Sequence, residues 1–168
     1  MRDDQSVDKV LVVRKMLHLI AIFGGLTPEE IEIVIPLLME MDCVPDQMIF
    51  RQGAVSTAIY IVKTGMVKIV MEDPEEGPLE LLALYPGACF GETSLIGIQP
   101  HSASAVAVEE SELLVLSNEK LFSLHKGHMD LFAKIILNIA RESCRQLYRS
   151  AGVLDHFLHV SHKNHLRD

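Results

Sequence analysis

Six short β-rich runs, separated by glycine, proline and acidic residues, restrict the fold of this chain more than any other feature. They occupy residues 48–53, 58–65, 66–73, 79–87, 102–108 and 111–116. Strands at such short spacing are typical of antiparallel rolls and sandwiches, whereas alternating βαβ units would place helical patterns between them. We therefore predict an antiparallel roll in which the acidic insert 72–78 forms a solvent-exposed hairpin loop.

Helical patterns flank the β-rich runs on both sides. Residues 9–23 repeat apolar side chains with helical spacing, and two glycines end this pattern. A second helix is predicted after Thr27, because Thr27 is a favourable N-cap, proline follows it and Glu30 completes a capping box. Beyond the β-rich runs, residues 118–127 and 129–158 predict a short helix and a long one.

This order of elements predicts a mainly β fold with flanking helices. The expected architecture is an antiparallel double-stranded β-helix, a jelly-roll-like β-roll, with N-terminal helices and a long C-terminal helix. Residues 1–45 are expected to form the helical lead-in, 46–117 the β-roll, 118–150 the C-terminal helices, and 151–168 the helix end and a polar tail.

The balance of charges argues against nucleic acid as a partner. The 168 residues include 15 lysines and arginines against 23 aspartates and glutamates, which leaves a formal net charge of −8. A protein that grips DNA neutralises phosphates with clustered basic side chains. No direct DNA binding is therefore predicted.

Membrane insertion and disulfide bonding are not predicted either. The apolar stretch 10–26 is short and is interrupted by charged side chains and a histidine. The three cysteines, Cys43, Cys89 and Cys144, are odd in number and lie far apart. They indicate buried free thiols in a reducing compartment, so a cytoplasmic location is expected.

The segment 87–107 has the composition of an anion-binding loop. Gly87 and Gly91 bracket a tight turn, Glu92 follows directly, and His101 comes nine residues after Glu92. Such a turn can expose consecutive backbone N–H groups to an anion, much as the N-terminus of a helix does. A carboxylate beside them would accept a hydrogen bond from a sugar hydroxyl, and a nearby cation would balance a phosphate.

The same segment resembles the phosphate-binding cassette of the cyclic-nucleotide-binding domain family, which includes catabolite activator proteins and kinase regulatory subunits. The matching residues are Phe90-Gly91-Glu92, Thr93-Ser94, Leu95 and, after a turn, Pro100-His101-Ser102-Ala103. Upstream, Ile49-Phe50-Arg51, Gly53, Tyr60-Ile61-Val62, Gly65 and Val67 resemble the strand-turn-strand signature of the family. The likeness extends over about residues 17–150. It implies a β-roll that binds a cyclic mononucleotide, cyclic AMP first of all.

The resemblance also implies a set of ligand-binding residues: Gly91, Glu92, Thr93, Ser94, His101, Ser102, Ala103 and Gln146. The phosphate would rest on residues 91, 92, 102 and 103, and Glu92 would accept the ribose 2′-hydroxyl. The alternative for Glu92 is a structural one, in which it caps the turn at residues 93–94. The alternative for Ser102 is an ordinary turn or strand-edge serine.

The long C-terminal helix would act as a lid in this family, and its polar side chains would meet the base. Gln146 is the best-placed candidate by spacing, and Ser143 and Arg145 are weaker ones. The alternative is that each of them is solvated or faces a second copy of the chain.

The chain departs from the family at His101, where the pattern has an arginine. Arginine is always charged and offers a bidentate fork, whereas histidine has an unperturbed pKa of about 6.5 and is mostly neutral at pH 7. Loss of a charged, bidentate contact would cost about 1.5–3 kcal/mol. Three outcomes stay open: a pocket that still binds cyclic nucleotide, one that binds another small ligand, and one that binds none.

Two functions follow from these outcomes. The preferred one is a sensor module in which cyclic nucleotide binding moves the helices at 118–150 and signals to a separate, unidentified protein partner. The alternative is a degenerate domain that acts as a dimeric protein-interaction scaffold. We do not predict an enzyme, because the sequence offers no paired carboxylate site, nucleophile motif or metal cluster, and no cofactor is expected.

The long helix also suggests a homodimer. Its stripe of Leu131, Ile135, Ile139 and Leu147 has no second domain to cover it, and an apolar stripe in water favours self-association. Four histidines recur at every third position near the end of the chain, at 156, 159, 162 and 165. Steps of three residues drift around a helix, so we interpret them as a polar tail rather than a metal site.

Overall fold

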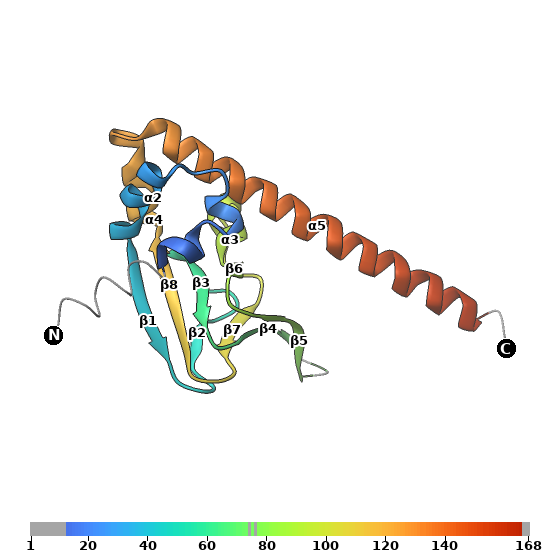
Figure 1. Cartoon of the computed structure of the whole chain (residues 1–168). Helices are drawn as coiled ribbons and strands as arrows, with labels where there is room; N and C mark the ends of the chain where they lie inside the picture. Colours follow the sequence, from blue (N-terminus) through green and yellow to red (C-terminus); the bar gives the residue numbers. More distant parts are fainter. Residues whose placement is uncertain (1–12, 74, 76, 166–168) are drawn as a thin grey trace.

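Eight strands form two four-stranded antiparallel sheets, in the order β1-β8-β3-β6 and β2-β7-β4-β5. The computed structural model describes residues 13–165 except 74 and 76. The strands are β1 (Leu38–Cys43), β2 (Met48–Phe50), β3 (Ala58–Thr64), β4 (Val67–Asp73), β5 (Gly77–Leu84), β6 (Cys89–Phe90), β7 (Ser104–Ala107) and β8 (Ser111–Ser117). First and last strands pair, as β1 does with β8 and β2 with β7. This nesting confirms the predicted β-roll with flanking helices (Figure 1).

Two of these strands lie outside the six predicted runs. β1 pairs with β8 along its whole length, from Leu38 opposite Leu116 to Cys43 opposite Ser111, so strand structure begins before the expected start of the roll at residue 46. Pro36 ends the helical pattern two residues before β1. The apolar residues after it do not by themselves indicate a strand, and pairing with β8 defines β1. β6 is two residues long and pairs with β3, which is too short to give a periodic signal.

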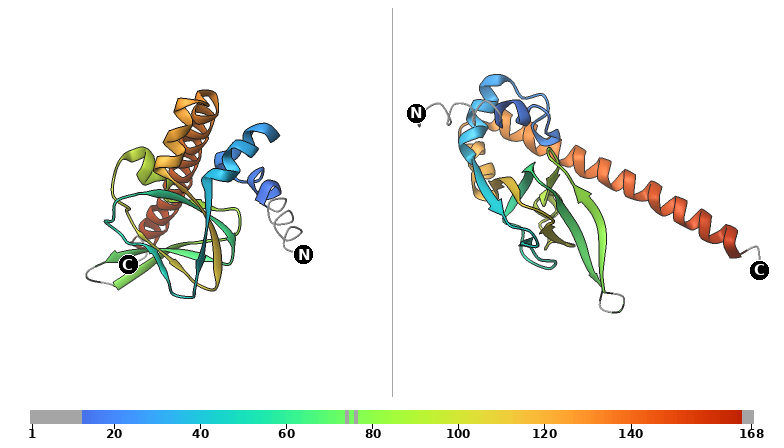
Figure 2. Two further views of the ribbon diagram at one scale, coloured as in Figure 1. Left: turned by 90° about the vertical axis from the view of Figure 1, so that its left-hand side faces the viewer. Right: turned by 60° about the horizontal axis from the view of Figure 1, so that its bottom comes forward.

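The helical segments cover one side of the roll (Figure 2). They are a turn of helix at residues 13–17, η1 (Ala21–Phe23), α2 (Pro28–Val34), η2 (Ile35–Leu37), α3 (Glu92–Gly97), α4 (Asn118–Ser123), η3 (Leu124–Lys126) and α5 (Met129–His165). The predicted capping box is present: Glu30 N donates to Thr27 Oγ1 at 3.2 Å, and Thr27 N donates to Glu30 Oε2 at 2.9 Å.

The predicted helix over residues 9–23 is wrong in its second half. The chain leaves the helix after residue 17, passes through Ile20 in an extended conformation and forms η1. Ile20, Ile22 and Phe23 are all fully buried. One face of a continuous α-helix cannot bury residues 20, 22 and 23 together, so burial of all three favours the break.

Two apolar layers meet at the sheet that contains β3 and β8. Ile59 and Ile61 of β3 face the helices, whereas Tyr60 and Val62 point into the roll. β8 alternates in the same way, with Leu114 on the helical side. Because both faces of this sheet are buried, its strands are continuous apolar runs rather than alternating ones.

α5 is packed against the N-terminal segment at its start and extends past the roll at its end (Figure 1). Leu131, Ile135 and Ile139 are buried in the helical core, whereas Leu147 is 72% exposed. The expectation that this stripe is uncovered is therefore wrong for its first three members. The N-terminal segment covers these three residues, because η1 packs against α5. The sequence pattern did not predict the break in the helix that forms η1.

Candidate functional site

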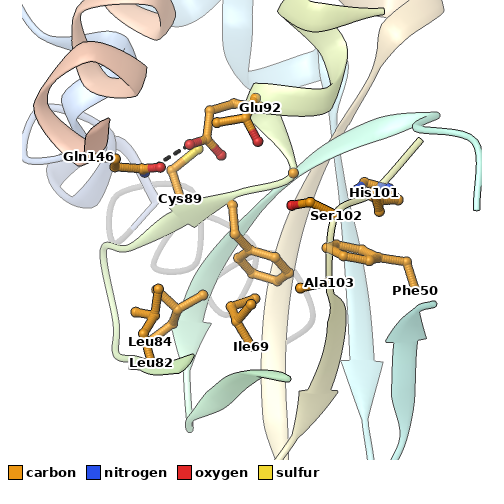
Figure 3. A pocket seen from close by; sticks show the side chains of 13 residues that line it. Phe50, Ile69, Leu82, Leu84, Cys89, Glu92, His101, Ser102, Ala103 and Gln146 are labelled. Atoms are coloured by element: carbon orange, nitrogen blue, oxygen red, sulfur yellow. Dashed lines mark hydrogen bonds between the residues drawn. The ribbon is translucent and has the colours of Figure 1, made fainter. Parts of the chain in front are cut away.

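A cavity of about 160 Å³ lies between the roll, α3 and α5 (Figure 3). It combines an apolar wall from the strands with polar groups from the 90–103 segment and from α5. The lining residues are Phe50, Ile69, Leu82, Leu84, Cys89, Phe90, Gly91, Glu92, Thr93, His101, Ser102, Ala103 and Gln146. Such a mixture, mostly apolar with a few convergent polar groups, is typical of a small-molecule site.

Gly91 directs the chain from β6 into α3 and so places Glu92 at the cavity. Its φ of +85° is in the left-handed region that favours glycine. A Cβ atom at this position would lie 3.1 Å from the Ala58 carbonyl oxygen and 3.3 Å from the Tyr60 ring. Both the backbone conformation and the close approach of β3 therefore require glycine here.

Glu92 is a buried carboxylate with one oxygen bonded and one oxygen unsatisfied. The residue is 1% exposed. Its Oε1 accepts a hydrogen bond from Gln146 Nε2 of α5 at 2.8 Å, and its Oε2 has no hydrogen-bond partner among the described residues. Burial raises the pKa of Glu92, hydrogen bonding to its own backbone N–H and to Gln146 opposes this rise, and the charge of Glu142 adds to it.

His101 lies against an aromatic cluster at the other side of the cavity. Its ring stacks on Phe50, with ring centroids 3.7 Å apart and an interplanar angle of 9°. Phe50 in turn contacts Tyr60 and Phe90. The residue is 5% exposed, and burial lowers the pKa of its imidazole from the usual 6.5. In the free protein at pH 7 the ring is therefore mostly neutral.

The remaining candidate residues are distributed unevenly around the cavity. Thr93 and Ser102 are exposed at its edge, and Ala103 is buried in its wall. The Ser94 side chain lies outside the described part of the structure. Of the weaker candidates on α5, Arg145 forms an ion pair with Glu142 at 2.7 Å, and the Ser143 hydroxyl is buried.

No arginine or lysine belongs to the lining in the part of the chain that the structure describes. The cavity therefore brings seven of the eight predicted residues together while it provides no permanent positive charge. A phosphate in it would depend on backbone N–H groups, the Ser102 hydroxyl and protonation of His101.

The residues that sequence reasoning missed form the apolar wall. Ile69, Leu82, Leu84 and Cys89 come from β4, β5 and β6, and burial raises the pKa of the Cys89 thiol well above its usual range. Phe50 belongs to the predicted strand-turn-strand signature and Phe90 to the predicted cassette, and neither is predicted to line a cavity. Only the curvature of the roll shows which apolar side chains of a strand face a ligand-sized space.

Neither a metal-binding cluster nor a membrane-spanning helix is present among the described residues. Within them, no cluster of three or more histidine, cysteine or acidic side chains has a metal-binding arrangement, although the side chains of the histidines at 156–165 lie outside the described part. None of the described helices combines the length and hydropathy that a membrane span requires.

Comparison with known sequences gives one family. Its description is "Cyclic nucleotide-binding domain", and its sequence model matches residues 41–128. A cyclic AMP receptor protein from Thermus thermophilus is 37% identical over 103 residues, which are 61% of this chain and 48% of the relative. A cyclic nucleotide-gated cation channel from Ictalurus punctatus is 28% identical over 117 residues, which are 66% of this chain and 16% of the channel. The chain thus spans about half of the first relative and less of the second.

Solved structures share the fold. The catabolite activator protein of Thermus thermophilus superposes with a TM-score of 0.71 and 34% identity, covering 82% of this chain and 62% of that one. The regulatory domain of Toxoplasma gondii PKA, solved with cAMP, superposes with a TM-score of 0.70 and 21% identity, covering 84% and 52%. At the lower identity the likeness is one of fold.

Proposed function

The chain belongs to the cyclic nucleotide-binding domain family, and on that basis we propose that it binds a cyclic mononucleotide, cyclic AMP first of all, in the cavity beside Glu92. In this proposal the phosphate rests on Gly91, Ser102 and Ala103. The Glu92 carboxylate accepts the ribose 2′-hydroxyl, and the apolar wall receives the base. The domain acts as a regulatory module and performs no chemistry on its ligand.

The unsatisfied oxygen of Glu92 is the observation that carries this proposal. A buried carboxylate oxygen without a donor costs about 1–3 kcal/mol or more, and folded proteins rarely keep one without a reason. Its position in the lining of the cavity, after Gly91, is the one in which the family resemblance implies a hydroxyl acceptor. A ribose hydroxyl would supply the missing donor.

One observation favours a second candidate function, the scaffold without a ligand. His101 replaces the arginine of the family pattern and is stacked on Phe50 as a buried, neutral ring. If the energy of phosphate binding depended on a permanent countercharge, this cavity would not retain the nucleotide. The domain would then serve as a protein-interaction module.

In either function, we propose that α5 is the element through which the domain contacts other proteins. Binding at Glu92 reaches this helix through Gln146, and α5 carries exposed apolar side chains at Leu147 and Tyr148. We propose that this part of α5 forms a homodimer and presents a surface to a separate protein partner in the cytoplasm. Because phosphate contacts in this acidic chain would lack clustered cations, DNA is not the proposed partner.

Isothermal titration calorimetry distinguishes the two functions. The chain is titrated with cyclic AMP, cyclic GMP and 5′-AMP at pH 6 and at pH 8. Sensor function predicts saturable binding of a cyclic nucleotide, stronger at pH 6, with 5′-AMP as the non-cyclic control. Absence of binding by both cyclic nucleotides at both pH values would overturn the sensor function and leave the scaffold.

A further inference from the structure

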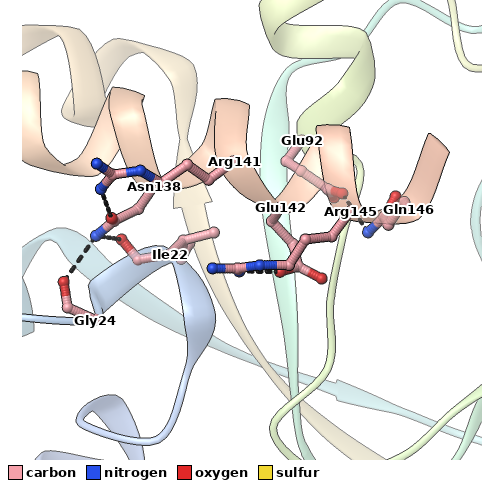
Figure 4. A network of polar contacts seen from close by, with 8 residues as sticks. All are labelled: Ile22, Gly24, Glu92, Asn138, Arg141, Glu142, Arg145 and Gln146. Atoms are coloured by element: carbon pink, nitrogen blue, oxygen red, sulfur yellow. Dashed lines mark hydrogen bonds and ion pairs between the residues drawn. The ribbon is translucent and has the colours of Figure 1, made fainter. Parts of the chain in front are cut away.

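The hydrogen bond from Gln146 to Glu92 connects the cavity to a helix that is otherwise held at a different place. Figure 4 shows both points of attachment. Asn138 Nδ2 donates to the Gly24 carbonyl at 2.8 Å and to the Ile22 carbonyl at 3.3 Å. Gln146 lies eight residues, or about two turns, further along α5.

The N-terminal part of α5 is fixed by packing and not by the cavity. Leu131, Ile135 and Ile139 are buried, and Lys134 forms an ion pair with Glu30 at 2.6 Å. Beyond Ile139 the contacts change, since Gln146 bonds to Glu92 while Leu147 and its neighbour Tyr148 are exposed. Beyond residue 139, the Gln146–Glu92 hydrogen bond is therefore one of the contacts that hold α5 at the cavity, together with the half-buried Glu142 and Ser143.

The two oxygens of Glu92 can serve α5 and a ligand together. Oε1 accepts from Gln146, and Oε2 is the oxygen without a described partner. A hydroxyl donor at Oε2 would add to the Gln146 bond rather than replace it. Both donors favour the ionised carboxylate. A carboxylate that Gln146 already holds in one orientation presents Oε2 to the hydroxyl with less loss of side-chain freedom on binding.

In the free protein the Gln146 amide therefore donates to Glu92 while its side chain lines the cavity. We infer that Gln146 is a positioning residue that holds the Glu92 carboxylate for a ligand hydroxyl and thereby couples occupancy of the cavity to the seating of α5 beyond residue 139. This inference rests on the proposed function for its ligand, and on the Gln146–Glu92 bond alone for the link to α5.

Hydrogen exchange measured by mass spectrometry on the full chain tests the link, and calorimetry tests its effect on cyclic AMP affinity. Q146L removes the donor and keeps an apolar side chain of similar size, whereas Q146K keeps a donor that can reach the carboxylate. Without ligand, Q146L and E92A are expected to exchange faster than wild type at residues 140–148, with residues 129–138 unchanged. Q146K is expected to stay close to wild type.

With cyclic AMP, wild type and Q146K are expected to gain protection at residues 140–148, and Q146L to gain none. Q146L should bind about 2–12-fold more weakly, the factor for one ordinary hydrogen bond. The double variant E92A/Q146L should bind no more weakly than E92A, because Gln146 acts through Glu92.

Three results would overturn the inference: equal affinity of Q146L and wild type, ligand-induced protection of α5 in Q146L, or additive losses in the double variant. Additive losses would assign Gln146 a contact of its own with the ligand. If wild type binds no cyclic nucleotide, the proposed function fails, and the ligand-free exchange data alone decide the link. Unchanged exchange at residues 140–148 in both Q146L and E92A would then reject it.

Discussion

The imidazole of His101 lies parallel to the phenyl ring of Phe50, with ring centroids 3.7 Å apart. This stacking places the residue that replaces the family arginine in an apolar environment, where burial lowers its pKa. The cavity is therefore neutral on this side in the free protein. Any countercharge for a phosphate must arise by proton uptake when the ligand arrives.

Cyclic nucleotide affinity should rise as the pH falls from about 8 to about 6, because the phosphate raises the pKa of His101 and binding takes up a proton. H101R should tighten binding about 10–150-fold at pH 8, the equivalent of 1.5–3 kcal/mol, and should flatten the pH dependence. H101F is the matched control, since it retains an aromatic ring on Phe50 without a proton to gain. Calorimetry over this pH range measures all three proteins.

Tight binding by wild type without any pH dependence would show that His101 is not the phosphate partner. Absence of binding by wild type at pH 6 and by H101R would show that the cavity is closed for a reason other than charge.

Removal of the Glu92 carboxylate should weaken cyclic nucleotide binding more than it disturbs the fold. E92A is expected to lose about 1.5–3 kcal/mol of binding free energy, the range for a hydrogen bond to a charged group. E109A, which removes an exposed carboxylate outside the cavity, should bind like wild type. Unchanged affinity of E92A in calorimetry would assign Glu92 a structural role only.

The stability of E92Q should depend on pH in a defined direction. Burial raises the folded-state pKa of Glu92 above its usual 4.5, so its ionisation destabilises the fold progressively as the pH rises from 4.5 through that folded pKa. E92Q should increase the free energy of unfolding at pH 7, because the neutral amide does not carry the desolvation cost of the buried charge. Urea titrations at pH 7 and pH 4 should show this gain disappearing at the lower pH. A gain that grows toward pH 4 would contradict the assignment.

Gly65 and Gly53 provide a matched pair for the packing of the roll. Both have a φ near +80°, but a Cβ on Gly65 would lie 2.2 Å from Ser111 Oγ and 2.6 Å from the Glu110 carbonyl oxygen, whereas nothing lies within 4 Å of one on Gly53. G53A should cost about 1 kcal/mol for the backbone alone, and G65A at least about 2 kcal/mol more. Equal midpoints of G65A and G53A in urea unfolding would show that the backbone at Glu110 and Ser111, where β8 begins, shifts to relieve the clash.

The exposed part of α5 is predicted to form a dimer interface. Leu147 and Tyr148 are 72% and 84% exposed, and the exposed thiol of Cys144 lies one turn before Tyr148. Wild type should sediment as a dimer, L147E should shift it toward monomer, and mild oxidation should crosslink Cys144 between two copies. A wild-type monomer in analytical ultracentrifugation would reject the dimer.

Local patterns in the chain were sufficient for much of the fold. The Thr27–Glu30 capping box formed as predicted because its hydrogen bonds join residues three positions apart. The antiparallel roll also followed from short apolar runs and turn residues. By contrast, β1 and the break after residue 17 depend on β8 and on α5, which are distant in sequence. Pro36 is a local signal for the end of a helix, but not for the strand that follows it.

The site divides in the same way. The sequence alone identified the segment that carries the polar groups: Gly91, Glu92, His101 and Ser102. This was possible because the turn at Gly91 and the spacing to residue 101 are local features. Only the tertiary structure decided what these groups contact. The stacking of His101 on Phe50 joins two residues that are 51 positions apart, and the hydrogen bond from Gln146 to Glu92 joins two that are 54 positions apart. Burial and pairing in the folded chain, and not the neighbours in sequence, set the charge state of such side chains.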